Sequence, residues 1–215
     1  MSAVKVPNMQ ESGGYMSSRM RLYDDRNQRL YINRQERERF LAVARKSELP
    51  LRAFCLTLVF TGCRLSEALA LTVGSVDVES RFVSIRTLKK RCRHEVREVP
   101  IPVELAAALS LLCDRRIAEN PEVAVDGVSL WTSHHQAVDR ITGYRWIKSV
   151  MKESGIQGMQ ASPKGLRHGY GVHALRSGVQ LNMLRKWMGH ASMATTAIYA
   201  NAVGRDELEI AERMW

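Results

Sequence analysis

The hydrophobic pattern of this chain changes its period around residues 82–101, and that change limits the folds open to it. Elsewhere, apolar residues at helical spacing predict helices over 34–44, 51–61, 64–71, 102–117, 136–152, 163–177, 181–188 and 205–214. In the exceptional stretch, residues 82–85 and 95–101 are rich in β-branched side chains and flank a strongly basic link, which predicts an antiparallel hairpin. We therefore expect a mainly α fold with a small antiparallel β-sheet packed on its side (α+β).

The length of 215 residues suits one globular domain with a substantial core. Residues 1–30 mix Ser, Gly, Met and charged residues without a sustained apolar period, so a flexible N-terminal arm is expected there. The domain itself is expected over residues 31–215, ending in a C-terminal helix at about 204–215.

The charge of the chain favours a polyanionic partner. The 32 Lys and Arg residues outnumber the 22 Asp and Glu residues, which leaves a formal net charge of +10. Nucleic acid is the default partner for such an excess, although solvated charged faces on an ordinary soluble protein explain it equally well. No stretch is long and apolar enough to span a membrane, and the most apolar one, residues 54–63, predicts a buried helix.

The four cysteines indicate a reducing compartment. Cys55, Cys63, Cys92 and Cys113 form no CxxC pair, and Cys55 and Cys113 lie in apolar helical patterns, where a reduced thiol behaves as a small hydrophobe. The first residues carry no secretion signal. We therefore expect a cytoplasmic protein, and with DNA as its partner, one associated with the nucleoid.

Residues suited to phosphodiester chemistry follow one another in a distinctive order. The first part of the chain contributes Arg64 and Glu67 in TGCRLSE, followed by the basic residues Lys89, Lys90, Arg91 and Arg93 in TLKKRCRHEVREVPIP. The C-terminal third adds Lys164 and Arg167 in SPKGLRHGYG, His190 in WMGH and Tyr199 in TTAIYA. Each motif alone has an ordinary structural explanation. Their order along the chain, rather than any single motif, indicates a function.

In this order the motifs resemble the catalytic domain of the tyrosine recombinases, the family of integrases, invertases and resolvases that shares its fold core with type IB topoisomerases. The resemblance covers residues 33–199. It implies a site-specific recombinase that cuts and rejoins DNA through a 3′-phosphotyrosyl intermediate without metal, cofactor or ATP. The catalytic residues that it implies are Arg64, Lys89, Lys164, Arg167, His190 and the nucleophile Tyr199, with Glu67 in support.

The resemblance also implies partners. They are double-stranded DNA and further copies of the chain in a tetramer on DNA, where the segment after the tyrosine docks on a neighbour. Residues 205–215 have an apolar helical side that suits such docking and equally suits folding back on their own domain. The further cations expected to contact DNA are Lys90, Arg91, Arg93, Arg185 and Lys186.

Two departures from the family pattern are visible. Lys164 occupies a position where most relatives have a histidine, three residues before Arg167. In addition, no helical DNA-clamping domain precedes the catalytic motifs, which resembles the short fimbrial invertase branch of the family and also fits a truncated chain.

The chemistry explains why these residue types are needed. Guanidinium groups are planar and permanently charged, so Arg64 and Arg167 can clamp a phosphate whose negative charge grows in the transition state, while His190 donates a further hydrogen bond. A tyrosine hydroxyl has an ordinary pKa of about 10, so Tyr199 needs nearby cations or a base. The leaving 5′ hydroxyl needs a proton, for which Lys89 is the expected donor and Lys90 the alternative.

Simpler interpretations exist for the same residues. Arg64 and Glu67 can form a local ion pair on a helix, and residues 89–93 can merely keep a hairpin tip solvated. His168 and His173 fit packing roles within a helix, and a tyrosine in an apolar context such as that of Tyr199 is usually a core residue. The ordered motifs favour functional roles over these simpler interpretations for all of these residues except the two histidines, which we expect to be structural.

Two other functions remain open. A DNA-binding regulator or accessory factor on the same fold accounts for Lys164 and for the missing clamp domain. A monomeric relaxing enzyme of the type IB class uses the same chemistry without exchanging partners.

Overall fold

The computed structural model describes residues 20–88, 95–133, 136–201, 208 and 211–212. The α-helices are α1 (Arg34–Lys46), α2 (Leu49–Thr61), α3 (Leu65–Leu69), α4 (Val103–Glu119), α5 (Arg140–Glu153), α6 (Pro163–Arg176), α7 (Leu181–Met188) and α8 (Met193–Ala197). Short 3-10 helices are η1 (Val73–Ser75), η2 (Val125–Gly127) and η3 (Ile198–Asn201). The strands are β1 (Val76–Asp77), β2 (Phe82–Arg86), β3 (Val96–Pro100), β4 (Thr132–Ser133) and β5 (Gln136–Ala137). The expected mainly α fold with small antiparallel sheets is confirmed.

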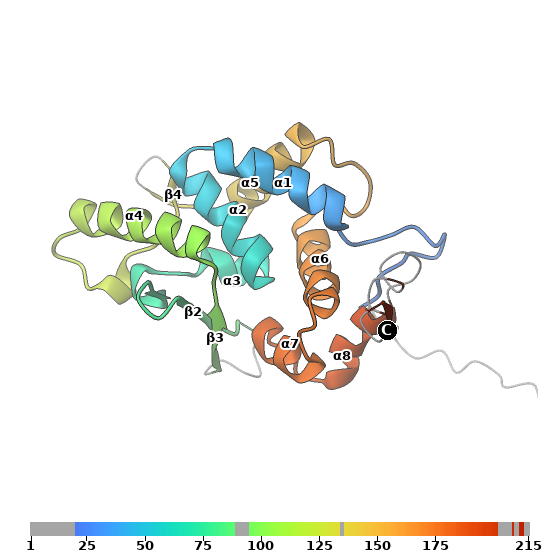
Figure 1. Cartoon of the computed structure of the whole chain (residues 1–215). Helices are drawn as coiled ribbons and strands as arrows, with labels where there is room; N and C mark the ends of the chain where they lie inside the picture. Colours follow the sequence, from blue (N-terminus) through green and yellow to red (C-terminus); the bar gives the residue numbers. More distant parts are fainter. Residues whose placement is uncertain (1–19, 89–94, 134–135, 202–207, 209–210, 213–215) are drawn as a thin grey trace, which may run out of the picture.

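Helix α2 lies at the centre of the helical bundle because it is apolar on nearly every side. Its residues from Ala53 to Val59 are all buried, and it packs against α1, α4 and α6. Pro50 in its first turn starts the helix, and Gly62 ends it in the left-handed conformation at φ +60°. Figure 1 shows α6 running from this bundle toward α7 and α8. None of the helices in the described residues combines the length and apolarity needed to cross a membrane.

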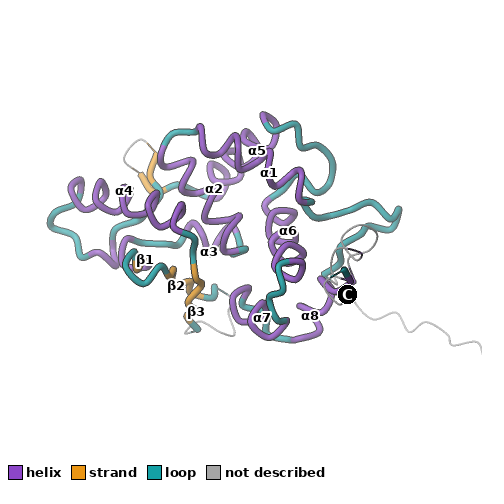
Figure 2. Tube along the Cα trace, viewed as in Figure 1, coloured by secondary structure: helices purple, strands orange, loops and turns teal. Residues whose placement is uncertain are grey.

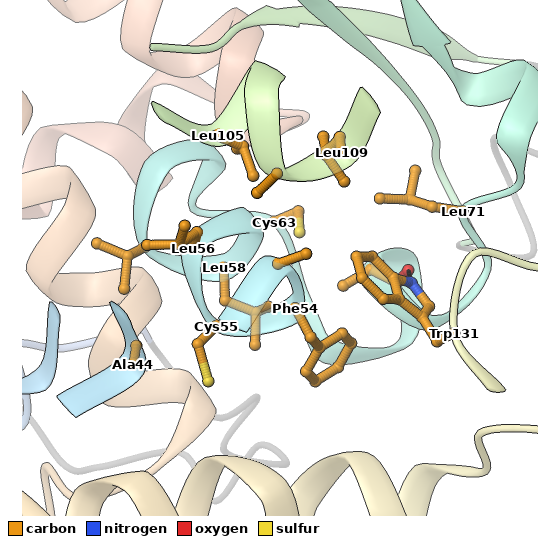
Figure 3. Close-up of a cluster of buried hydrophobic side chains, with 14 of the residues drawn as sticks. Ala44, Phe54, Cys55, Leu56, Leu58, Cys63, Leu71, Leu105, Leu109 and Trp131 are labelled. Carbon is orange, nitrogen blue, oxygen red and sulfur yellow. Dashed lines mark hydrogen bonds between the residues drawn. The ribbon is translucent and has the colours of Figure 1, made fainter. Parts of the chain in front are cut away.

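The main core is centred on aromatic side chains from distant parts of the chain. Phe54 meets Trp131 and Trp146 edge to face, with ring centroids 5.0 and 5.6 Å apart. The indole nitrogen of Trp131 donates to the Ala68 carbonyl over 2.6 Å, so this buried ring has its polar atom satisfied. Figure 3 shows the Trp131 ring between Phe54 and Leu71, with Leu105 and Leu109 of α4 at the end of the cluster away from Phe54.

The sheet has three antiparallel strands in the order β1-β2-β3. Val83 and Ile85 of β2 and Val99 of β3 face the core, and Ile85 pairs with Arg97 across the hairpin. Figure 2 shows how little of the trace is strand, and the sheet contacts α3 through β2 and α7 through β3. The expected hairpin is confirmed, whereas β1 was not anticipated.

The helix expected over residues 136–152 begins later than predicted. Gln136–Ala137 pairs with Thr132–Ser133 as β5, and α5 begins only at Arg140. The side chain of Asp139 accepts a hydrogen bond from the Thr142 backbone N–H over 2.7 Å and so caps the helix start. The prediction for the first residues of this range was therefore wrong, because the capping residue outweighed the apolar spacing.

A second, smaller core surrounds the C-terminal helices. Leu22 and Tyr31, which precede α1, are buried in it with Leu184, Met188 and Tyr199. Of the arm expected over residues 1–30, residues 1–19 lie outside the described residues, as does most of the helix expected over 205–214, whereas residues 20–30 are described and Leu22 is buried. The segment just before α1 therefore packs beside the residues that follow α6.

Helix α4 offers a direct test of the main core. Leu112 is fully buried and its neighbour Leu111 is 57% exposed. Leu112→Ala should lower the free energy of unfolding by about 2–5 kcal/mol, because it loses apolar burial and leaves a cavity. Leu111→Ala, the matched control, should change it by less than about 0.5 kcal/mol. Urea unfolding followed by circular dichroism measures both, and equal losses would contradict the packing described.

Candidate active site

Arg64 stands at the start of α3, where a tight turn and a carboxylate hold it. Gly62 precedes it at φ +60°, and a Cβ at Gly62 would lie 2.2 Å from the Tyr170 ring, so only glycine fits. Glu67 accepts from the Arg64 backbone N–H over 2.9 Å and from its Nη1 over 2.7 Å. The Arg64 side chain is 28% exposed, so the guanidinium remains accessible to a ligand.

Glu67 is buried and also accepts from a second arginine, Arg97 of β3, over 2.7 Å. Burial raises the pKa of Glu67, but the charges of Arg97 and Arg64 and the hydrogen bonds from both more than offset this and hold the pKa below its usual value. Glu67 therefore remains a carboxylate at neutral pH. Its contact with Arg64 is the local ion pair considered from sequence, and Arg97 extends that pair into a buried network.

Arg167 lies on α6 with its side chain directed between two other elements. Its Nη1 donates to the Gly62 carbonyl over 2.6 Å, and its Nη2 donates to the Met188 carbonyl at the end of α7 over 2.7 Å. Burial and the nearby charge of Arg64 lower the pKa of Arg167 to about 10, so it remains a cation at neutral pH. Arg167 thereby ties the turn before Arg64 to the residues before His190.

His190 follows α7 directly and faces the tyrosine. Gly189 ends α7 at φ +63°, which turns the chain so that His190 becomes buried. Its Nδ1 lies 2.9 Å from the Thr196 hydroxyl oxygen, and its ring stacks on the Tyr199 ring with centroids 6.1 Å apart and planes 14° apart. The histidine and the tyrosine are therefore direct neighbours.

Tyr199 lies in η3 and is fully buried. A Cβ at Gly171 of α6 would lie 2.6 Å from its ring, so this glycine makes room for the tyrosine. Its hydroxyl oxygen lies 3.2 Å from Nδ1 of His168. Burial raises the pKa of Tyr199 to about 12, although the charges of Arg167 and Arg64 oppose the rise. The hydroxyl is thus protonated and sheltered in this arrangement.

His168 has a contact that its helical pattern does not reveal. Burial, with smaller contributions from the charges of Lys164 and Arg167, lowers the pKa of His168 to about 4. The ring is therefore neutral at physiological pH, and its Nδ1 can accept a hydrogen bond from the Tyr199 hydroxyl. The sequence indicated a packing residue, whereas the structure places its ring against the expected nucleophile.

Two surface cavities are lined by further basic side chains. Arg64, Lys164 and Arg167 line a cavity of about 420 Å³ together with Arg140 and Tyr144 from the start of α5. Lys164 is exposed at the first turn of α6. Arg140 and Tyr144 were not singled out from the sequence, since nothing in their spacing marks them.

A second cavity, of about 460 Å³, lies between the base of the hairpin and α7. Arg185 and Lys186 are exposed along it, and His190, Arg97 and Glu95 also line it. The hairpin residues Lys89, Lys90, Arg91 and Arg93 lie outside the described residues. Among the residues that are described, no three His, Cys, Asp or Glu side chains gather closely enough to hold a metal ion.

The sequence of this chain is similar to those of known proteins. The sequence model of the phage integrase family matches residues 31–204. The tyrosine recombinase XerA of Pyrococcus furiosus is 26% identical over 182 residues, which cover 85% of this chain and 60% of that protein. The tyrosine recombinase XerC of Roseiflexus castenholzii is 33% identical over 168 residues, covering 72% of this chain and 51% of that one.

A solved structure is similar in fold as well. The crystal structure of XerA recombinase matches with a TM-score of 0.73 and 28% identity, over 86% of this chain and 64% of that one. The chain thus spans roughly half to two thirds of the length of the relatives it matches.

The buried histidine beside Tyr199 makes stability depend on pH. The pKa of His168 is about 4 in the folded chain and its ordinary value is 6.5, so the unfolded chain binds more protons between these values. The stability contributed by the neutral ring is present above pH 6.5 and is lost as pH falls toward 4. His168→Asn keeps an acceptor near the Nδ1 position without titrating. It should therefore show a shallower loss of unfolding free energy from pH 7 to pH 4, measured by urea unfolding, and identical slopes would contradict a depressed pKa.

Proposed function

The chain belongs to the phage integrase family, and from this premise we propose that it is a site-specific DNA recombinase that cleaves and rejoins strands through a 3′-phosphotyrosyl intermediate on Tyr199. The observation that carries the proposal is the bridge made by Arg167. It binds the Gly62 carbonyl beside Arg64 and the Met188 carbonyl beside His190, whose ring stacks on Tyr199. The proposed nucleophile and the three side chains proposed to bind the phosphate therefore lie close together.

Phosphate binding falls to Arg64 and Arg167. Both line the same cavity with Lys164, and no acidic residue lines it among the described ones. Each guanidinium has N–H groups beyond those used in the hydrogen bonds above, and these can donate to the nonbridging oxygens of the scissile phosphate. Their fixed charge stabilises the negative charge that develops as the phosphorus is attacked. His190 adds a hydrogen bond to the same oxygens.

Tyr199 must leave its buried position before it can react. The Tyr199 hydroxyl is buried against His168, so reaching a phosphate requires the segment of α8 and η3 to shift. As the ring leaves, the burial that raises its pKa is lost, whereas the nearby cations that favour the phenolate remain. In the buried arrangement neutral His168 can accept a hydrogen bond from the phenol. That bond breaks when the segment shifts, and the phenol proton passes to solvent as the bond to phosphorus forms.

The leaving group and the return step complete the cycle. Attack by Tyr199 breaks the bond between phosphorus and the 5′ oxygen, and Lys89 at the hairpin donates the proton that this oxygen takes up, with Lys90 as the alternative. The phosphotyrosine retains the energy of the broken bond, so a 5′ hydroxyl from another strand can reverse the attack without ATP. Lys164, which lines the phosphate cavity, supplies a further positive charge there.

The proposed partner is double-stranded DNA. Exposed Arg185 and Lys186, together with the hairpin cations Lys90, Arg91 and Arg93, contact its backbone in this proposal. Strand exchange between two duplexes requires a tetramer of chains, in which residues 204–215 dock on a neighbour. The proposed catalytic domain covers residues 31–215, and the segment from residue 20 to 30 packs against it through Leu22.

A tyrosine substitution tests the nucleophile. With a nicked suicide substrate carrying the target site, Tyr199→Phe should abolish the covalent protein–DNA adduct on a denaturing gel, because no other group takes the phosphate. Its DNA affinity should stay within about threefold of the unaltered chain, since the cations proposed to bind the DNA backbone are unchanged. Tyr170→Phe, which removes a phenol from α6, is the control and should form adduct normally.

The alternatives predict different results in this experiment. An adduct that persists in Tyr199→Phe rules out this nucleophile. Specific binding by the unaltered chain with no adduct at all indicates a DNA-binding regulator. Relaxation of supercoils by single chains, without recombinant products, indicates a relaxing enzyme.

A conservative change at Arg167 tests the phosphate clamp. Arg167→Lys keeps the charge, but one ammonium cannot bind the Gly62 and Met188 carbonyls and a phosphate together. Single-turnover cleavage should slow by about 100-fold or more, as expected when a preorganised donor to the reacting phosphate is lost. Arg115→Lys, at an exposed position of α4, is the control and should cleave at the original rate, and equal rates for both variants would contradict the clamp.

A further inference from the structure

Arg97 is a buried arginine on a strand, and its bonds reach two other elements. Its Nε donates to the Trp187 carbonyl in α7 over 2.7 Å, and its Nη2 donates to Oε2 of Glu67 in α3 over 2.7 Å. The side chain is 7% exposed. One guanidinium thereby joins β3, α3 and α7, which come from widely separated parts of the chain.

Both partners of Arg97 stand next to proposed catalytic residues. Glu67 uses its Oε1 to hold Nη1 of Arg64 and its Oε2 to hold the Arg64 backbone N–H. Trp187 lies three residues before His190 and belongs to the same final turn as the Met188 carbonyl that Arg167 binds. A shift of Arg97 would therefore move Arg64 and His190 relative to each other.

Close packing leaves this guanidinium little freedom. A Cβ at Gly189 would lie 2.9 Å from Nη1 of Arg97 and 3.0 Å from its Cζ, so the guanidinium packs directly on the glycine that turns the chain into His190. Nη1 is buried and makes no hydrogen bond with the described residues. The position of Arg97 is thus determined by two directed bonds and by contact with the Gly189 backbone.

Stability alone is a weak reason for such a group. Burying charges is costly, and well-packed apolar residues often replace a buried ion pair without loss of stability. A buried ion pair that links two parts of one site is therefore better explained by the positions in which it holds them.

We propose that Arg97 is a positioning residue that sets the separation of Arg64 and His190 across the scissile phosphate and ties both to the strand leading from the hairpin tip. This inference rests on the proposed recombinase function. Arg97 touches neither DNA nor the reacting atoms in this role.

The charges around Glu67 provide a readout that packing alone does not. The groups that face it are Arg64, Arg97, Arg167 and the buried thiol of Cys63. Arg97 is the strongest of the influences that lower the pKa of Glu67, so removing it raises that pKa. Protonated Glu67 no longer holds Arg64 as a carboxylate, and cleavage should then fail at a higher pH than in the unaltered chain.

Three variants of the full chain test the inference by single-turnover cleavage of the suicide substrate, DNA affinity and thermal unfolding. Arg97→Met should slow cleavage by about 100-fold, as expected when reacting groups are misplaced. Its DNA affinity should stay within about threefold of that of the unaltered chain. In its pH–rate profile, the loss of cleavage on the acid side should move to higher pH. Arg97→Lys, which can satisfy one partner but not both, should cleave at an intermediate rate. Arg97→Met/Glu67→Gln, which leaves no unpaired carboxylate, should recover most of the melting temperature lost by the single variant while remaining slow.

The outcomes separate this inference from the proposed function. If the unaltered chain forms an adduct and Arg97→Met cleaves at the same rate with the same pH profile, Arg97 is not a positioning residue. The same conclusion follows if cleavage recovers together with melting temperature in the double variant, because Arg97 then acts only through stability. If the unaltered chain forms no adduct, the recombinase function itself fails, and this inference fails with it.

Discussion

Two buried guanidinium groups on the last carbonyls of α7 are the interaction on which the rest of the site depends. Arg97 binds the Trp187 carbonyl and Arg167 binds the Met188 carbonyl, each over 2.7 Å. The last carbonyls of a helix have no partner within it and carry the negative end of its dipole, so cationic donors suit them. Because His190 follows directly, these two bonds fix it relative to α3 and α6, from which Arg64 and Arg167 come.

The same arrangement encloses Tyr199, the proposed nucleophile. The stacked His190 ring, the Gly171 backbone and neutral His168 enclose Tyr199, whose hydroxyl is buried and whose pKa is raised to about 12. The cations that would activate the phenol are close, yet the phenol faces His168. Under the proposed function, this enclosure requires α8 and η3 to move before Tyr199 can reach a phosphate.

The sequence predicted the elements better than the network between them. Helical spacing and Pro163 placed α6 and α7 almost at their observed bounds, and β-branched residues located β2 and β3. The sequence did not predict a role for Arg97, because that role depends on its contact with Glu67, which lies 30 residues away. His168 likewise meets a tyrosine 31 residues away, so its helical pattern indicated only packing. Local patterns report which face a residue occupies, whereas these contacts depend on how separate elements come together.

The assignment of Tyr199 as the covalent nucleophile is tested most directly by locating the adduct on the protein. After reaction with target DNA, the complex is digested with nuclease and trypsin, and the peptide of residues 187–205, whose only tyrosine is Tyr199, is analysed by mass spectrometry. We expect a nucleotide remnant attached through phosphate to Tyr199, and sequencing of the trapped DNA ends from the same reaction identifies the site of cleavage. An adduct on any other residue would contradict the mechanism.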